Sequence, residues 1–149
     1  MRGALLVALA ILAPRAATAQ VATRPLAVEA RADGIFARRA TATHVGVGLA
    51  RRASRNLEMA LVLAGGITTR DELDDPRASA RADVLGRFAP APASPTAWTA
   101  YASVGVGGLF ERGTTGRAVL VLLAGVRGQR AFVEAGLGGG LRLGAGLRL

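Results

Sequence analysis

Charged side chains recur at alternate positions of several segments that are otherwise rich in glycine, alanine and apolar residues. Carboxylates and guanidinium groups occur there in equal numbers, with small residues between them. This pattern is typical of ion pairs in a narrow interior, because an unpaired buried charge is strongly destabilising, and glycine leaves space for long arginine side chains. The residues that we expect to form this network are Glu29, Arg31, Asp33, Glu58, Arg81, Asp83, Arg87, Glu134, Arg142 and Arg148.

Catalytic and metal-binding residues are scarce. The chain has one histidine and no cysteine, which excludes a site with two histidine ligands, a thiolate zinc site and a cysteine nucleophile. A Ser–His hydrolase could use His44 with Ser103, which shares its parity, but no G-x-S-x-G turn is present. We favour a histidine near the start of a strand that makes one hydrogen bond, and we expect a protein that is not an enzyme.

Two further patterns, an acidic run and glycine-rich stretches, resemble a calcium loop and a phosphate loop but lack the defining residues of either. A run of four carboxylates lacks the D-x-D-x-D-G spacing of a calcium loop, so a solvated acidic loop is the favoured interpretation. The glycine-rich stretches at 105–108 and 136–140 lack the Gly-Lys-Ser/Thr of a phosphate loop. We therefore expect neither a metal nor a cofactor. The carboxylates are Asp71, Glu72, Asp74 and Asp75.

The first twenty residues have the three parts of a secretory signal peptide. Arg2 gives a positive start, residues 4–13 form an apolar run that ends at Pro14, and 17–19 is a small-x-small site with cleavage expected before Gln20. The apolar run is too short for a membrane-spanning helix, which needs about 20 residues. The beginning of the chain therefore predicts export, and we assign residues 1–19 to the signal peptide.

The rest of the chain alternates apolar with polar or small residues, which is typical of half-buried β-strands. Polar, proline-rich or glycine-containing connections separate the alternating stretches, and 68–79 is the longest of them. No stretch after residue 20 has 18 consecutive apolar residues. The spacing predicts an antiparallel all-β meander. Its segments are 26–38, 44–50, 57–67, 79–88, 97–111, 117–127 (apolar on both faces, so of ambiguous orientation) and 131–149.

The content of the two faces distinguishes a soluble barrel from a membrane barrel. In a membrane barrel the apolar face meets lipid and the polar face points inward. Since the polar face here holds small residues and balanced charges, we expect Leu61, Val104 and Leu143 to point outward. Aromatic residues near strand ends fit interfacial girdles. These are Phe36, Phe88, Trp98, Phe110 and Phe132.

With its signal peptide, alternating strands and charged inner face, the chain resembles small bacterial outer-membrane β-barrels of the eight-stranded type. The last twelve residues, GGGLRLGAGLRL, are similar to the C-terminal strand that the barrel-assembly machinery recognises, although Leu149 stands where that strand usually has Phe or Trp. The resemblance implies an up-and-down meander closed into a barrel of about eight strands, formed by residues 20–149. A turn at 138–140 divides the last segment and makes the number of strands even.

The resemblance also implies a location in the bacterial outer membrane and contact with its lipid. The net charge of +9 does not indicate nucleic acid, because the arginines are scattered and aromatic residues make up only 4%. Arg70 and Arg77 lie at one rim with four arginines that are candidates for contacts with lipopolysaccharide phosphates. These four are Arg38, Arg39, Arg112 and Arg117.

We expect a non-enzymatic outer-membrane barrel whose lumen is charged and plugged, with a structural or surface-interaction role in the envelope. Two alternatives stay open at this point. A secreted or periplasmic soluble β-barrel would bind a small apolar ligand in a cavity lined by the apolar face. A small barrel enzyme would act on envelope lipid and depend on His44.

Overall fold

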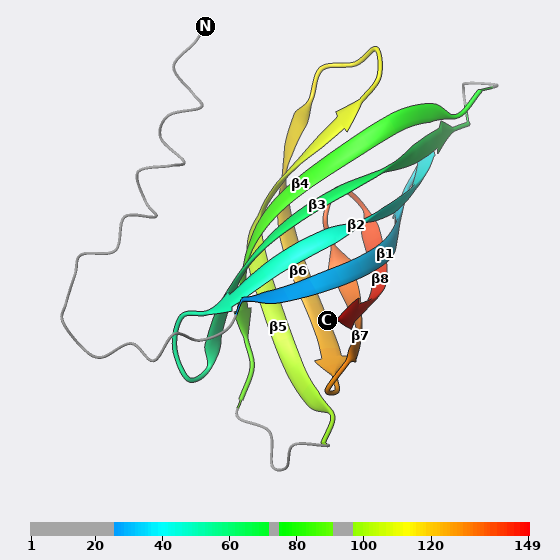
Figure 1. Cartoon of the computed structure of the whole chain (residues 1–149). Helices are drawn as coiled ribbons and strands as arrows, with labels where there is room; N and C mark the ends of the chain where they lie inside the picture. Colours follow the sequence, from blue (N-terminus) through cyan, green and yellow to red (C-terminus); the bar gives the residue numbers. More distant parts are fainter. Residues whose placement is uncertain (1–25, 72–74, 91–96) are drawn as a thin grey trace, which may run out of the picture.

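Eight antiparallel strands close into a barrel in the computed structural model of the chain, which describes residues 26–71, 75–90 and 97–149 (Figure 1). Each strand pairs with the next along the chain, and β8 returns to pair with β1. The predicted all-β up-and-down barrel is therefore confirmed. The strands are β1 (Ala27–Ala37), β2 (Ala40–Arg52), β3 (Leu57–Arg70), β4 (Arg77–Phe88), β5 (Thr99–Glu111), β6 (Arg117–Arg127), β7 (Ala131–Leu137) and β8 (Leu141–Arg148).

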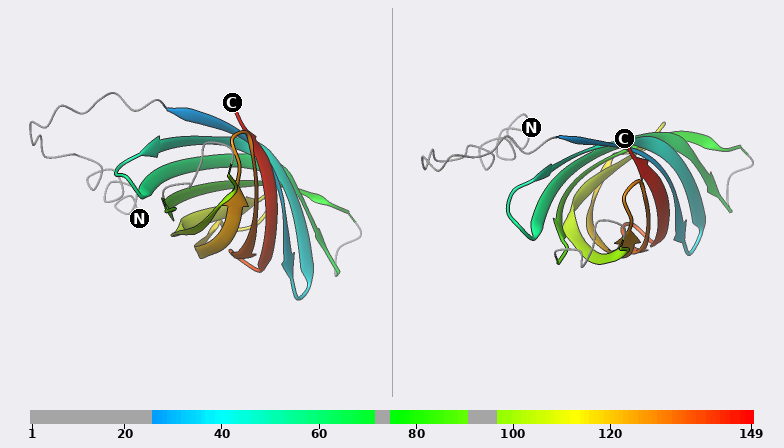
Figure 2. Two further views of the ribbon diagram at one scale, coloured as in Figure 1. Left: turned by 90° about the horizontal axis from the view of Figure 1, so that it is seen from below. Right: turned by 60° about the horizontal axis from the view of Figure 1, so that its bottom comes forward.

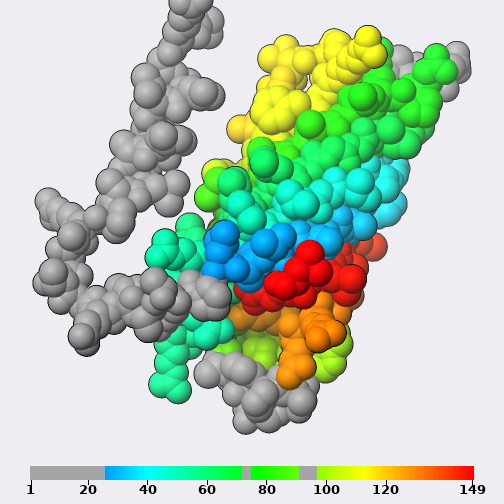
Figure 3. All heavy atoms as spheres, viewed as in Figure 1, coloured from blue at the N-terminus to red at the C-terminus, as the bar shows by residue number. Residues whose placement is uncertain are grey.

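Closure of the sheet is visible from several directions. The strands curve around one interior (Figure 2), and β1 and β8 lie in contact along the face seen in Figure 3. Within the described ranges, no helix has the length and hydrophobicity of a membrane-crossing helix. The expected signal peptide lies outside the described residues.

The last predicted segment is divided as expected into β7 and β8. Gly139 has a φ of +83°, which favours glycine, and the Gly138 amide donates to the Gly140 carbonyl at 3.0 Å. β7 and β8 are the two shortest strands, with 7 and 8 residues. The β6–β7 ladder begins only at Leu122 and Leu137, so residues 117–121 are paired on the β5 side alone.

Three strands, β2, β3 and β4, extend beyond their predicted bounds, and the connections between them are correspondingly shorter. β4 begins at Arg77 rather than Ser79. β2 begins at Ala40 rather than His44 and continues through Arg52, and β3 continues to Arg70. The physical reason is pairing: Thr41 lies opposite Thr69, and threonine is well suited to a pleated surface. The predicted long loop at 68–79 was therefore wrong at both of its ends.

The apolar face lies on the outside of the barrel. Leu61, Val104 and Leu143 are 41%, 55% and 47% exposed, whereas their neighbours of opposite parity are buried or half-buried. The same alternation settles the orientation of β6, where Val121 and Leu123 point inward and Leu122 points outward.

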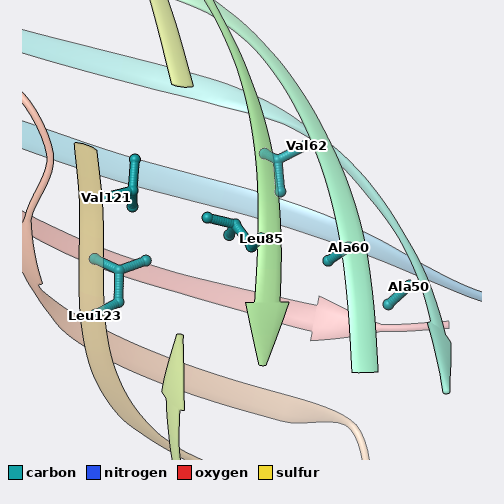
Figure 4. Close-up of a cluster of buried hydrophobic side chains, with 6 residues drawn as sticks. All are labelled: Ala50, Ala60, Val62, Leu85, Val121 and Leu123. Atoms are coloured by element: carbon teal, nitrogen blue, oxygen red, sulfur yellow. The ribbon is translucent and has the colours of Figure 1, made fainter. Parts of the chain in front are cut away.

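An apolar cluster fills part of the interior, which the sequence pattern did not indicate. Its side chains come from β2, β3, β4 and β6, and in Figure 4 Leu85 faces Val121 and Leu123 across the interior. Leu85 and Val62 interrupt the polar parity of their strands. The members of the cluster are Ala50, Ala60, Val62, Leu85, Val121 and Leu123.

One aromatic residue contradicts the predicted girdle. Phe36, Phe88, Trp98 and Phe110 are each at least 46% exposed on the outer face, but Phe132 is only 5% exposed. Phe132 shares the inward parity of Glu134 on β7, and the guanidinium carbon of Arg31 lies 4.9 Å from the centre of its ring. The assignment of Phe132 to a girdle was therefore wrong, and a cation–π contact holds this ring inside.

We predict that Leu85→Ala lowers the free energy of unfolding by about 2–5 kcal/mol, because it leaves a cavity in the interior cluster. Leu61→Ala on the outer face is the matched control, with an expected change of about 0.5 kcal/mol or less. Denaturant titration followed by circular dichroism measures both values. Equal losses in the two variants would contradict the inward placement of Leu85.

Candidate functional site

The charged residues singled out in the sequence meet inside the barrel in two groups. The first, the aspartate cluster, consists of Asp33, Arg81, Asp83 and Arg142. The second, the glutamate cluster, joins carboxylates of β1, β3 and β7 to arginines of β1, β4, β6 and β8. Its charged members are Glu29, Arg31, Glu58, Arg87, Arg127, Glu134 and Arg148.

The aspartate cluster is a closed arrangement of two arginines and two carboxylates. Arg81 donates both terminal nitrogens to Asp33, with Nη2 to Oδ2 at 2.9 Å. Arg142 donates from Nη1 to Asp83 Oδ2 at 2.9 Å, and its Nε lies 3.3 Å from Asp33 Oδ1. All four residues are at most 5% exposed. Opposite charges in equal number and bidentate geometry are what buried charges need in order to persist.

Glu29 and Glu134 anchor the glutamate cluster. Arg87 donates two hydrogen bonds of 2.6 and 2.9 Å to Glu29, while Arg31 donates to both Glu29 and Glu134. The Tyr101 hydroxyl donates to the second oxygen of Glu134 at 2.8 Å. Every oxygen of these two carboxylates therefore accepts at least one bond from a described side chain.

Glu58 continues this cluster toward one end of the barrel. Its carboxylate receives Arg148 at 2.6 Å, Arg127 at 3.2 Å and Arg87 at 3.3 Å. The side chains of Arg127 and Arg148 are 17% and 25% exposed, so the network reaches solvent here. Sequence reasoning missed Arg127 because β6 is apolar on both faces. The inward parity that Arg127 shares with Val121 was the available clue.

Glycines leave space for the network, chiefly beside its carboxylates. A Cβ at Gly107 would lie 2.2 Å from Asp83 Oδ1, and one at Gly48 would lie 3.0 Å from Glu29 Oε2. The expectation that glycine would accommodate arginine stems holds in a weaker form, since a Cβ at Gly138 would lie 3.6 Å from Arg142 Cδ.

His44 is part of the interior rather than of a recognisable catalytic group. It is 1% exposed, and its Nε2 lies 3.1 Å from Ser79 Oγ. The Ser103 hydroxyl makes no hydrogen bond to a described residue, so the His44–Ser103 pair is not formed. Asp33 lies opposite His44 in the β1–β2 register, but its carboxylate is bonded to Arg81. These contacts lack an acid that orients the imidazole, as hydrolytic triads require.

A cavity of about 120 Å³ lies next to His44, in the mouth of the barrel at the end that carries the turns at 38–39, 112–116 and 138–140. Thr68, Ser79 and Leu109 are among its lining residues. Arg70 crosses the mouth and donates twice to Glu111, at 2.6 and 3.1 Å.

The arginines suggested for lipopolysaccharide contacts all lie at this same end. Arg38 and Arg39 form the β1–β2 turn, Arg112 follows β5, and Arg117 begins β6 and reaches the Gly139 carbonyl at 3.5 Å. Arg70 and Arg77 flank the β3–β4 connection at this end as well.

The structure describes only two of the four carboxylates of the acidic run. Asp71 and Asp75 are exposed, while Glu72 and Asp74 lie outside the described residues. Among the described residues, no group of three or more histidine, aspartate or glutamate side chains is arranged to hold a metal ion.

Comparison with known proteins adds no relatives: no family model matches the sequence, and no curated protein is significantly similar to it. The class is therefore defined by the fold and its interior, namely an eight-stranded antiparallel β-barrel that contains arginine–carboxylate pairs.

We predict that Arg142→Met destabilises the barrel by about 3–5 kcal/mol, because it leaves two aspartates without their shared partner. Arg70→Met removes an exposed ion pair and should cost about 0–1 kcal/mol. Adding Asp83→Asn to Arg142→Met should recover part of the loss. Denaturant unfolding of the three variants tests this, and similar stabilities for the two single variants would contradict a buried, mutually dependent cluster.

We also predict that Gly107→Val lowers stability by about 1–3 kcal/mol, because the new side chain displaces the Asp83 carboxylate. Gly65→Val is the control, since a Cβ at Gly65 meets no atom within 4 Å. Thermal unfolding of both variants measures the difference, and unchanged stability of Gly107→Val would show that the space beside Asp83 is not needed.

Proposed function

We propose that this protein is a non-enzymatic outer-membrane β-barrel whose lumen is plugged by its own charged side chains. The observation that carries the proposal is the apolar outer surface. Large apolar residues are exposed on all eight strands, with Val45, Val106 and Leu120 each above 60%. A continuous apolar surface around a whole barrel is unfavourable in water and is what a lipid environment solvates.

The height of this surface supports the proposal. The chain advances 12 residues from Trp98, just before β5, to Phe110 near its end. At a rise of about 3.3 Å per residue and a tilt of about 45°, the two aromatic rings are about 28 Å apart along the barrel axis, close to the ~25 Å apolar band of membrane barrels. Phe36 marks the same end as Phe110, and Phe88 the same end as Trp98.

Backbone hydrogen bonding gives a second, independent reason. A spanning sheet must have no open edge within the hydrocarbon layer, because lipid cannot bond to backbone amides and carbonyls. The β1–β8 ladder supplies this closure and runs from Glu29–Arg148 to Phe36–Leu141.

The two charged clusters and the apolar cluster carry the proposal of a plugged lumen. Eight-stranded barrels have interiors just wide enough for side chains. Arg142 and Val62 are fully buried, and a guanidinium group that moved aside for a solute would leave its carboxylate partner unpaired in the interior. We therefore assign the protein a structural or surface-interaction role in the envelope rather than transport.

The partners of this function are lipid and, during insertion, the barrel-assembly machinery. Under the proposed export by residues 1–19, the chain ends lie in the periplasm and the opposite end faces outward. Arg38, Arg39, Arg112 and Arg117 then lie at the level of lipopolysaccharide phosphates, where guanidinium groups form bidentate bonds. No nucleic acid is involved in this proposal.

The soluble alternative is weakened on one specific point. A periplasmic or secreted barrel that binds an apolar ligand would need Leu61, Val104 and Leu143 around an internal cavity, but these side chains lie on the outer surface. The lipid-enzyme alternative would now depend on His44 with Ser79, and no hydrogen bond to a described residue orients the imidazole at Nδ1.

Val104→Arg tests the proposal. A charge at mid-height on the lipid face should cost about 2–4 kcal/mol and reduce the fraction of barrel that folds into bilayers, whereas Thr41→Arg near an end should cost about 0–1 kcal/mol. Heat-modifiable gel mobility after reconstitution gives the folded fraction. Recovery of the native protein in the soluble fraction without detergent, or equal folding of the two variants, would contradict a membrane location.

A further inference from the structure

The two ends of the barrel differ in how their charges are neutralised. We call the end at which β1 begins and β8 ends, with the turns at 53–56 and 128–130, the terminal end, and the opposite end the loop end. At the loop end Arg70 is paired with Glu111, and Asp71 and Asp75 are exposed beside the arginines. The sequence adds Glu72 and Asp74 to the same connection.

The terminal end has four exposed arginines outside the interior ion pairs, one of which, Arg52, lies opposite the buried Glu58 in the β2–β3 ladder. Arg51 and Arg52 close β2, Arg55 lies in the following turn, and Arg130 lies in the β6–β7 turn. All four are exposed, and within the described residues none of them forms an ion pair. The glutamates nearest this end are already used inside. They are Glu29, Glu58 and Glu134, each at most 4% exposed and bonded to interior arginines.

These arginines surround the end instead of forming one pocket. The β2–β3 hairpin and the β6–β7 turn lie on opposite sides of the closed sheet, with β4 and β5 between them in one direction and β8 and β1 in the other. A small ligand could not contact both, whereas a lipid leaflet that encircles the barrel contacts both at once.

Outward aromatic residues mark the same level. Phe88 and Trp98 are 57% and 60% exposed at this end. A Cβ at Gly128 would lie 3.4 Å from the Trp98 ring, so the indole packs against the turn that carries Arg130. An amphipathic ring and a basic residue at the same level are typical of the boundary between acyl chains and headgroups.

We propose that the terminal end binds the phosphodiester headgroups of anionic phospholipids in the leaflet that surrounds it, through Arg51, Arg52, Arg55 and Arg130. This inference rests on the proposed membrane location. Guanidinium groups bind phosphate oxygens in pairs, and each basic residue near a membrane surface adds to the attraction for anionic lipid. Phosphatidylglycerol is therefore favoured over a zwitterionic lipid at this end.

The single tryptophan of the chain makes a direct experiment possible. The full-length chain is reconstituted into phosphatidylcholine vesicles that contain phosphatidylglycerol, with either lipid brominated on its acyl chains. Quenching of Trp98 then reports which lipid occupies the terminal end. We expect phosphatidylglycerol to be preferred by about fivefold or more, and the preference to weaken at high salt.

Two matched variants test whether the terminal-end arginines cause the preference for phosphatidylglycerol. Replacing Arg51, Arg52, Arg55 and Arg130 together by glutamine should abolish the preference. The control replaces four loop-end arginines by glutamine, removes the same charge and should leave the preference intact. If the first variant does not fold, Arg130→Gln alone should reduce it. The control residues are Arg38, Arg39, Arg112 and Arg117.

The outcomes separate this inference from the proposed function. If brominated phosphatidylcholine quenches Trp98 in a folded barrel but phosphatidylglycerol quenches no better, the inference is overturned while the membrane location stands. Equal loss of preference in both quadruple variants would also overturn it, since net charge alone would then be responsible. If neither lipid quenches Trp98, both proposals are wrong.

Discussion

A closed sheet of eight strands encloses a space that only side chains can fill, and every second residue of each strand must enter it. Charges placed at those positions are largely withdrawn from bulk water, so most of them need a partner across the interior. The pairing of Asp33 with Arg81, and of Glu29 with Arg87, joins strands that are far apart around the sheet. These contacts determine which strands face one another and make the interior specific as well as filled.

Both ion-paired and apolar side chains fill the interior. Leu85 contacts the apolar cluster, while Asp83 and Arg87, two residues away on either side of it on β4, enter the aspartate and glutamate clusters. One strand therefore supports all three groups of side chains. The aspartate cluster has equal numbers of arginines and carboxylates, whereas the glutamate cluster has one more arginine than carboxylates. Because the aspartate cluster is neutral by itself, exchange of a single member disturbs it more than a comparable change at the rim.

Much of this arrangement follows from alternation. The parity that separates Glu29, Arg31 and Asp33 from their neighbours predicts both the outward apolar face and the set of residues that meet inside. The strand count followed from the glycines at 138–140. Alternation does not report which distant strands face each other, so it could not separate the two clusters or bring Tyr101 to Glu134.

Other features depend on information that a local pattern lacks. Arg127 lies on a strand that is apolar on both faces, and Phe132 has an aromatic ring that suits either a lipid boundary or a guanidinium partner. Only the three-dimensional placement of Arg31 shows that the Phe132 ring points inward. Similarly, Thr41 and Thr69 extend β2 and β3 because each finds the other across the ladder, which neither segment indicates alone.

The shortness of β7 and β8 has a geometric consequence for a barrel in a bilayer. The β6–β7 ladder ends at Leu122 and Leu137, so residues 117–121 of β6 have one flank of their backbone outside any ladder. Amides and carbonyls on that flank require water or headgroups. In the proposed bilayer, water or headgroups would therefore reach further along β6 than along β2 and β3, whose ladder continues to Ala40 and Arg70.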